Sequence, residues 1–149
     1  MEKTNDPVFF YEHEFYPFSN FSSFQIEWKG KLWPTSEHVY QAEKFEEGEV
    51  KEKMRGMRSA HEVFKYAEAH KDERRNDWGG VKVSLMKEIL KAKVAQHPYV
   101  LKKLRDSGDR MLIENSWRDP EWGWGPEKNG KNLLGKLWME VREEVRLPL

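Results

Sequence analysis

The 149-residue sequence contains no cysteine, which excludes disulfides, thiolate nucleophiles and cysteine-ligated zinc. It also lacks an excess of one charge, because 26 basic residues balance 26 acidic ones. Non-specific binding to nucleic acid needs a basic excess, so we expect none here. No segment approaches the ~20 apolar residues of a membrane span, and the polar N-terminus has no apolar run of signal length. We therefore expect a cytoplasmic protein with no membrane partner.

The motifs that hold a metal ion or a phosphate-bearing cofactor are also missing. The histidines form neither an HExxH helix nor a comparable pair of metal ligands; they are His13, His38, His61, His70 and His97. There is no GxGxxG turn, no Walker A loop and no Gly-x-Ser-x-Gly elbow. We therefore expect no metal and no cofactor, so the chemistry falls to the side chains themselves.

Aromatic residues, in contrast, are abundant, with seven Trp, eight Phe and five Tyr. Such rings bury a large area per side chain, and a chain of this length predicts a single compact domain over residues 1–149. The pattern of elements predicts an α+β fold dominated by helices, with a small β-sheet. Helices are expected at 36–45, 48–54, 60–70, 81–94, 98–107 and 132–146, and short strands at 8–11, 25–28, 31–33 and 110–113.

The stretch Trp33–Phe45 predicts a helix with a polar face. Pro34 ends the extended segment before it, and Thr35 or Ser36 can cap its first turn. Residues at i, i+3, i+4 and i+7 then bring a carboxylate, a phenol, an amide and an amine to one face, namely Glu37, Tyr40, Gln41 and Lys44. Two interpretations stay open: a catalytic face, or charges that only suit the helix dipole.

The second informative feature is the Gly-rich loop Trp117–Gly125, which contains three tryptophans and Asp119. Glycine lets a backbone approach a ligand closely, and an indole offers a flat face to a heteroaromatic ring. The alternative is an aromatic loop that covers a small core. The basic pair Arg74–Arg75 is also open to two interpretations, a phosphate contact or a solvated run of charge.

Long, ordered motifs run through most of the chain: Phe18–Phe21, Trp33–His38, Tyr40–Ala42, Lys44–Phe45, Trp78, Leu112–Glu114, Trp122–Gly123, Gly130–Asn132 and Leu134–Gly135. Together they resemble the NADAR family, also called YbiA-like N-glycosidases. The resemblance implies a YbiA-like α+β domain. It also implies an enzyme that hydrolyses the N-glycosidic bond of a small ribosyl phosphate without a metal.

The resemblance also implies roles for individual residues. Glu37 is expected to be the essential carboxylate, Lys44 a nucleophile that forms a Schiff base with the sugar, and Asp119 a third catalytic group. The expected substrate-binding residues are Asn20, Phe21, Tyr40, Gln41, Trp78, Trp122, Gly123 and Asn132. Cleavage of a ribosyl C–N bond builds positive charge at the anomeric carbon, which a carboxylate stabilises.

The resemblance leaves three functions open. The first is hydrolysis of riboflavin-biosynthesis intermediates, in which ribosylamine phosphate is attached to an aminopyrimidine. The second is removal of ADP-ribose from guanine bases of nucleic acid, and the third is a non-catalytic module that binds ADP-ribose or a nucleotide. Members of the family often carry a Gly-Arg pair before the tryptophan at 78. The segment Ala67–Arg75 has none, so the resemblance assigns no phosphate-binding residue.

Overall fold

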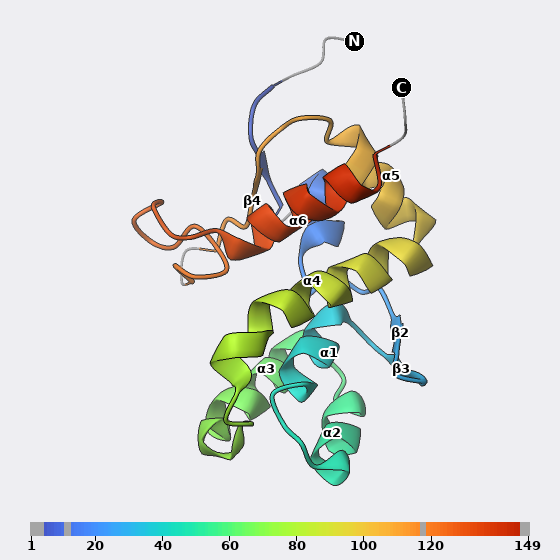
Figure 1. Ribbon diagram of the computed structural model, residues 1–149, viewed down its shortest axis with the longest axis vertical. Coiled ribbons are helices and arrows are strands. Elements are labelled where there is room, and N and C mark those ends of the chain that lie inside the picture. The colour runs from blue at the N-terminus through green and yellow to red at the C-terminus, as the bar shows by residue number, and fades with distance from the viewer. Residues whose placement is uncertain (1–4, 11–12, 117–118, 147–149) are drawn as a thin grey trace. The chain divides into compact units, whose positions relative to one another are not determined.

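The structure is a computed structural model that describes residues 5–10, 13–116 and 119–146 (Figure 1). The chain forms two compact units. The central unit is the continuous segment Asn20–Gln96. The terminal unit combines both ends of the chain, Met1–Ser19 and His97–Leu149. Among the described residues, no helix is both long enough and apolar enough to cross a membrane.

The central unit contains a β-hairpin and four α-helices. Strands β2 (Ile26–Trp28) and β3 (Lys31–Trp33) pair antiparallel, with Ile26 opposite Trp33. The predicted turn at Lys29 and Gly30 is confirmed, and both residues adopt the left-handed φ that a two-residue hairpin turn requires. The helices are α1 (Ser36–Ala42), α2 (Gly48–Arg55), α3 (Ala60–Ala69) and α4 (Trp78–Gln96), with a short 3-10 helix η2 (Lys71–Glu73) before α4.

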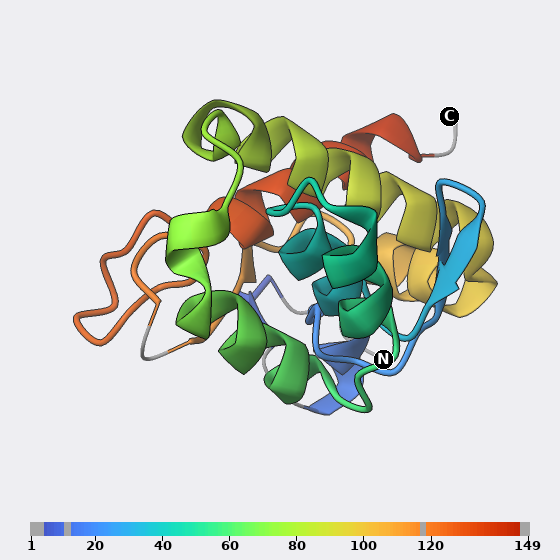
Figure 2. The same ribbon diagram turned by 90° about the horizontal axis from the view of Figure 1, so that it is seen from below.

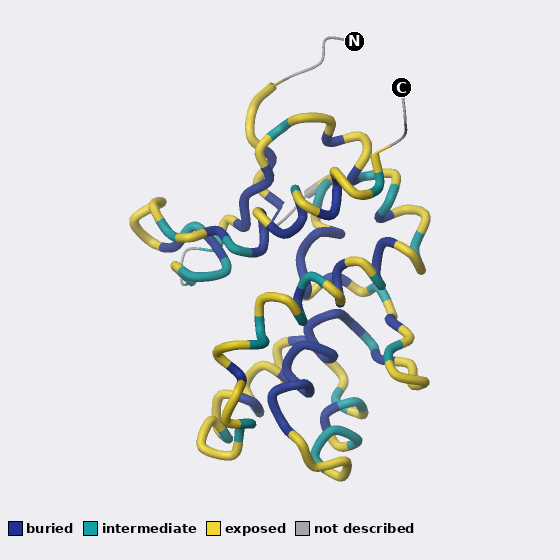
Figure 3. Tube along the Cα trace, in the orientation of Figure 1, coloured by how far each residue is buried: buried dark blue, intermediate teal, exposed yellow. Residues whose placement is uncertain are grey.

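Helix α1 is the centre of this unit. It contacts α2, α3, α4 and both strands of the hairpin, and Figures 1 and 2 show it lying among the three helices. Its start is as predicted, because the Thr35 side chain accepts a hydrogen bond from the His38 backbone N–H at 3.1 Å. Residues 35–45 are all buried and make the longest unbroken buried run in the described chain (Figure 3). A polar helical face thus lies inside the unit.

Helix α4 begins earlier than the sequence predicts. We expected it to follow Gly79 and Gly80, because glycine disfavours helix interiors, but both lie within its first turn. The buried Trp78 opens the helix, and its ring lies 5.2 Å from that of Tyr40 on α1, centroid to centroid. Packing of this indole outweighs the low helix propensity of the two glycines.

The terminal unit holds a second small sheet and two helices. Strand β1 (Val8–Phe9) pairs parallel with β4 (Leu112–Ile113). The helices are α5 (Pro98–Asp106) and α6 (Leu133–Glu144), and a 3-10 helix η1 (His13–Phe18) follows β1. The buried Trp138 donates its indole N–H to the Phe18 carbonyl at 2.8 Å. The expected small sheet is therefore present as two separate two-stranded pieces.

Candidate active site

Glu37 and Gln41 lie one turn apart on α1 and contact each other. The Gln41 amide donates a hydrogen bond from Nε2 to Glu37 Oε1 at 2.6 Å. Both residues are buried, with 6% and 2% of their surface exposed. The Glu37 backbone N–H donates to the Asn20 carbonyl at 3.1 Å, which fixes the helix start. The carboxylate is therefore held in one orientation at a site shielded from water.

Lys44 follows α1 and lies against two aromatic rings. Its Nζ is 5.3 Å from the Tyr40 ring centroid and 5.9 Å from that of Trp78. Burial lowers the pKa of Lys44 below its ordinary value. The carboxylates of Glu37 and Glu68 oppose this shift, while the cations of Arg74 and Lys82 reinforce it. A lysine with a lowered pKa is more often neutral near pH 7, as an amine nucleophile must be.

The segment before α4 is tied directly to Lys44. The Arg75 backbone N–H donates to the Lys44 carbonyl at 2.8 Å. The Arg75 side chain is held by Asp77, with Nε–Oδ1 at 2.6 Å and Nη2–Oδ2 at 2.9 Å. Arg74 makes no side-chain hydrogen bond or ion pair with any described residue. The two arginine side chains therefore differ. Asp77 holds that of Arg75, whereas that of Arg74 has no hydrogen-bond or ion-pair partner among the described residues.

Asn20 belongs to a buried network of polar side chains at the start of α1. Its Oδ1 accepts from Ser36 Oγ at 3.0 Å. Ser36 Oγ also lies 3.5 Å from Lys93 Nζ, which donates to Ser22 Oγ at 3.0 Å. Lys93 is wholly buried, and this burial lowers its pKa to about 7. Asn20 thus supports the helix that carries Glu37.

The sequence analysis did not identify Lys93. The signal that could have found it is its place on the apolar face of α4, four residues after Ile89 and one turn after Leu90. A lysine at such a position must either reach the surface or find polar partners inside. Here the partners are Ser22, which precedes α1, and Ser36, the first residue of α1.

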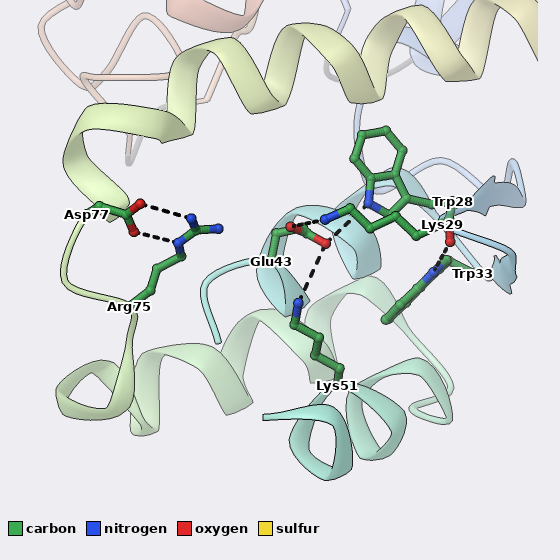
Figure 4. A network of polar contacts seen from close by, with 7 residues as sticks. All are labelled: Trp28, Lys29, Trp33, Glu43, Lys51, Arg75 and Asp77. Atoms are coloured by element: carbon green, nitrogen blue, oxygen red, sulfur yellow. Dashed lines mark hydrogen bonds and ion pairs between the residues drawn. The ribbon is translucent and has the colours of Figure 1, made fainter. Parts of the chain in front are cut away.

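A second buried carboxylate, Glu43, lies just past the end of α1 (Figure 4). It accepts from Trp28 Nε1 at 3.2 Å and Lys29 Nζ at 3.3 Å, and Lys51 Nζ lies 3.8 Å away. These contacts join α1 to the hairpin and to α2. A pocket of about 280 Å³ adjoins the cluster, lined by Lys29, Glu43, Arg75, Val81, Ser84, Leu85 and Glu88. Glu43 was not among the predicted site residues, and its contacts connect α1 to neighbouring elements, which is a structural role.

The structure thus brings five of the predicted site residues to α1 and its immediate surroundings: Glu37, Tyr40, Gln41, Lys44 and Trp78. Asn20 accepts a hydrogen bond from Ser36, the first residue of α1, and its neighbour Phe21 is exposed over 39% of its surface. In the described part of the chain, no group of three His, Asp or Glu side chains could hold a metal ion.

The other predicted residues belong to the terminal unit, in the loop between β4 and α6. Asp119 Oδ1 accepts from the backbone N–H groups of Glu121 and Trp122, each at 2.9 Å. A side chain at Gly123 would lie within 2.9 Å of the Glu114 carbonyl, so this glycine is required by close packing. Trp117, which opens the predicted loop, lies outside the described residues.

Asn132 closes that loop. Its Nδ2 donates to the Leu112 carbonyl and its Oδ1 accepts from the Glu114 backbone N–H, both at 2.9 Å. Its backbone adopts the left-handed conformation, with φ at 50°, which asparagine tolerates better than most residues. The amide therefore joins the start of α6 to strand β4 and the residue that follows it.

Comparison with known proteins gives one consistent result. The model of the NADAR domain matches residues 9–146. N-glycosidase YbiA of Escherichia coli is 36% identical over 130 residues, covering 87% of this chain and 81% of the relative. An N-glycosidase of Nostoc punctiforme is 36% identical over 132 residues, covering 87% and 85%.

Two further matches extend the comparison. The NMR structure of E. coli YbiA superposes with a TM-score of 0.87 at 34% identity, covering 97% of this chain and 87% of that one. A riboflavin biosynthesis protein of Vibrio vulnificus is 35% identical over 144 residues. That match covers 94% of this chain but only 39% of the relative, so this chain spans less than half of that relative's length.

Proposed function

The chain belongs to the NADAR family, and from that premise we propose that it hydrolyses the N-glycosidic bond of a ribosyl phosphate attached to a nucleobase-like ring. The relatives named as N-glycosidases support an enzyme of this class. The name of the Vibrio relative favours a riboflavin-biosynthesis intermediate, a ribosylamino-pyrimidine phosphate, as the substrate. The observation that carries the proposal is the buried cluster on and beside α1, where Glu37, Gln41 and Lys44 lie together.

The chemistry follows from these side chains. The neutral Lys44 amine attacks the anomeric carbon, and the electron pair of the C–N bond moves to the amino nitrogen of the leaving base, which takes up a proton from the attacking amine. The bond between the anomeric carbon and the ring oxygen then breaks, the ring oxygen takes up the second proton of the amine, and the open-chain sugar remains as a Schiff base on Lys44. Water adds to the imine carbon and releases the sugar, which restores the amine. Glu37 stabilises the positive charge that builds at the anomeric carbon. The net reaction consumes one water.

The surroundings of Lys44 support a phosphorylated sugar. Trp78 and Lys82 lie one turn apart on α4, so they share a face, and the Trp78 ring lies near Lys44 Nζ. Arg74 is adjacent to Arg75, whose backbone is bonded to Lys44. Both cations act on the charge of Lys44. Two positive groups beside the amine favour a substrate that carries negative charge.

The test uses two purified substrates, a ribosylamino-pyrimidine phosphate and an ADP-ribosylated guanosine, with the released base measured by mass spectrometry. We expect base release from the first. Base release only from the second would assign the ADP-ribosyl-guanine activity instead. Binding of either compound without base release, by a preparation shown to be folded, would overturn hydrolysis and leave a binding module.

The covalent step has its own test. Borohydride added during turnover reduces a Schiff base to a stable amine. We expect the mass of the reduced ribose phosphate on the peptide that contains Lys44, and no adduct in Lys44→Arg. Absence of the adduct in an active wild-type enzyme, with Lys44→Arg still active, would remove the covalent route and leave Glu37 acting through water.

A further inference from the structure

Gln41 uses only one end of its side-chain amide. Nε2 donates to Glu37, but Oε1 is buried and accepts no hydrogen bond from any described residue. A buried acceptor without a partner destabilises a protein, because it has lost its hydrogen bonds to water without replacement. Such an atom at a site with catalytic side chains is an indication that a ligand supplies the missing donor.

The orientation of this amide follows from its neighbour. An ionised carboxylate accepts hydrogen bonds and donates none, so the amide end that lies 2.6 Å from Glu37 Oε1 is the nitrogen. Rotating the amide by half a turn would place two oxygens against each other. The oxygen is therefore the end that stays available. It belongs to a residue one turn after Glu37 on the same face of α1, and three residues before Lys44, which follows the helix.

We propose that Gln41 Oε1 accepts a hydrogen bond from the sugar hydroxyl next to the reacting carbon, the 2-hydroxyl, while its Nε2 positions Glu37. The inference rests on the proposed function, because it needs the anomeric carbon to reach Lys44. A sugar held there presents its 2-hydroxyl on the carbon next to the anomeric carbon. Gln41 is then a specificity residue that distinguishes ribosyl from 2-deoxyribosyl substrates.

The expected discrimination has a physical basis. A 2-deoxyribosyl substrate leaves the buried oxygen without a donor, whereas the ribosyl substrate satisfies it. Sites that hydrogen-bond a substrate hydroxyl reject the analogue that lacks it, because the buried polar group is left unpaired. We expect the wild-type kcat/KM to favour the ribosyl substrate by about 10- to 100-fold.

The experiment compares two substrates that differ only in the 2-hydroxyl, with the wild type, Gln41→Met and the exposed control Gln25→Met. Methionine keeps the length of the side chain but offers neither the amide donor nor its oxygen. We expect Gln41→Met to lose activity toward both substrates, because Nε2 no longer positions Glu37, and to lose more toward the ribosyl substrate, so that the ratio of the two kcat/KM values falls toward one. Gln25→Met should keep the wild-type ratio. An unchanged ratio in a folded, active Gln41→Met enzyme would overturn the inference.

A second measurement removes the base from the comparison. Ribose 5-phosphate and 2-deoxyribose 5-phosphate are each incubated with the enzyme and borohydride, and the adduct on Lys44 is measured. We expect the wild type to favour ribose 5-phosphate and Gln41→Met to lose that preference. Equal trapping of both sugars by the wild type would show that Gln41 Oε1 does not bind the 2-hydroxyl. The base would then be the remaining part of the substrate that could donate a hydrogen bond to it. If the wild type cleaves neither nucleoside substrate, the proposed function itself fails, and the inference fails with it.

Discussion

Each unit of the protein contains a buried side-chain amide, and the two amides are used differently. In the terminal unit, Asn132 binds at both ends, to the Leu112 carbonyl and the Glu114 N–H. In the central unit, Gln41 binds only through Nε2. The first amide is fully used in holding a loop to a strand. The second has a partner for one end only, so the comparison separates a residue that stabilises the fold from one that we propose binds a ligand.

The carboxylates show the same contrast. Asp119 Oδ1 accepts two backbone N–H groups from the residues that follow it, an arrangement that shapes a turn. Glu37 lies on a buried helix, where a side-chain amide holds it. The family resemblance implied a catalytic role for both. Their local contacts favour Glu37 over Asp119, and the catalytic roles of both stay predictions.

The largest expected effect separates these carboxylates. Glu37→Gln removes the charge that we propose stabilises the transition state, so we expect kcat to fall by about two to three orders of magnitude with the fold intact. Asp119→Asn keeps an oxygen acceptor for the two N–H groups and should change kcat far less. Turnover and thermal melting measured on both variants check this. Comparable loss of turnover in the two variants would break the contrast.

The next effect concerns the two amides and is measured by urea unfolding. Asn132→Ala leaves the Leu112 carbonyl and the Glu114 N–H without their partner and places alanine in a left-handed conformation, so we expect a loss of about 2–4 kcal/mol. Gln41→Met removes the Nε2 donor to Glu37 but also an acceptor that was already unsatisfied, so the two changes partly offset each other and we expect a smaller loss of about 1–2 kcal/mol. A larger loss for Gln41→Met than for Asn132→Ala would reverse the assignment of the two amides.

A third effect compares two lysines of α4, the buried Lys93 and the exposed Lys91. The folded pKa of Lys93 is about 7, well below the ordinary value of 10.5, so between these pH values the unfolded chain binds the extra proton. Stability therefore rises with pH over this window, by at most about 1.4 kcal/mol per pH unit from this group. We expect Lys93→Met to flatten the rise and Lys91→Met to retain it. Parallel pH profiles of unfolding for wild type and Lys93→Met would contradict the assignment.

The smallest expected effect sharpens the electrostatics around Lys44. Lys82 lowers its pKa and Glu68 raises it, and the amine acts only when neutral. Lys82→Gln should therefore move the midpoint of the rising limb of kcat/KM to higher pH, and Glu68→Gln should move it to lower pH. Shifts in the same direction for both variants would show that this limb reports another group.

Much of the fold could be predicted from local signals. Lys29 and Gly30, between two short extended segments, predicted the hairpin turn, and both adopt the left-handed conformation that it requires. Thr35 predicted the start of α1, where its side chain caps the helix. The start of α4 was misplaced because it depends on packing of Trp78 against Tyr40, two residues far apart in the sequence. The division into two units was not predicted, since neither boundary carries a Gly- or Pro-rich linker.

The sequence predicted which side chains gather on and beside α1 but not the contacts that they make. The spacing of Glu37 and Gln41 predicted their shared face, because helical periodicity is a local property, whereas Lys44 follows the last residue of the helix, Ala42. Which end of Gln41 lies against Glu37, and that the other end has no partner, depends on what surrounds α1 in space. Lys93 was missed for the same reason, as its partner Ser22 is 71 residues away in the sequence.

The discontinuity of the terminal unit has a consequence for how the chain is made. Strand β1 cannot pair until β4 has been synthesised, because Val8 pairs with Leu112. The ribosome, adding about 5–20 residues per second, synthesises the whole central unit before it reaches that partner. The contacts of α1 with the hairpin, α2, α3 and α4 all lie within the segment Asn20–Gln96, so they need neither β4 nor α6. In the order of synthesis, the helix that carries Glu37 is complete before β1 and β4 can pair.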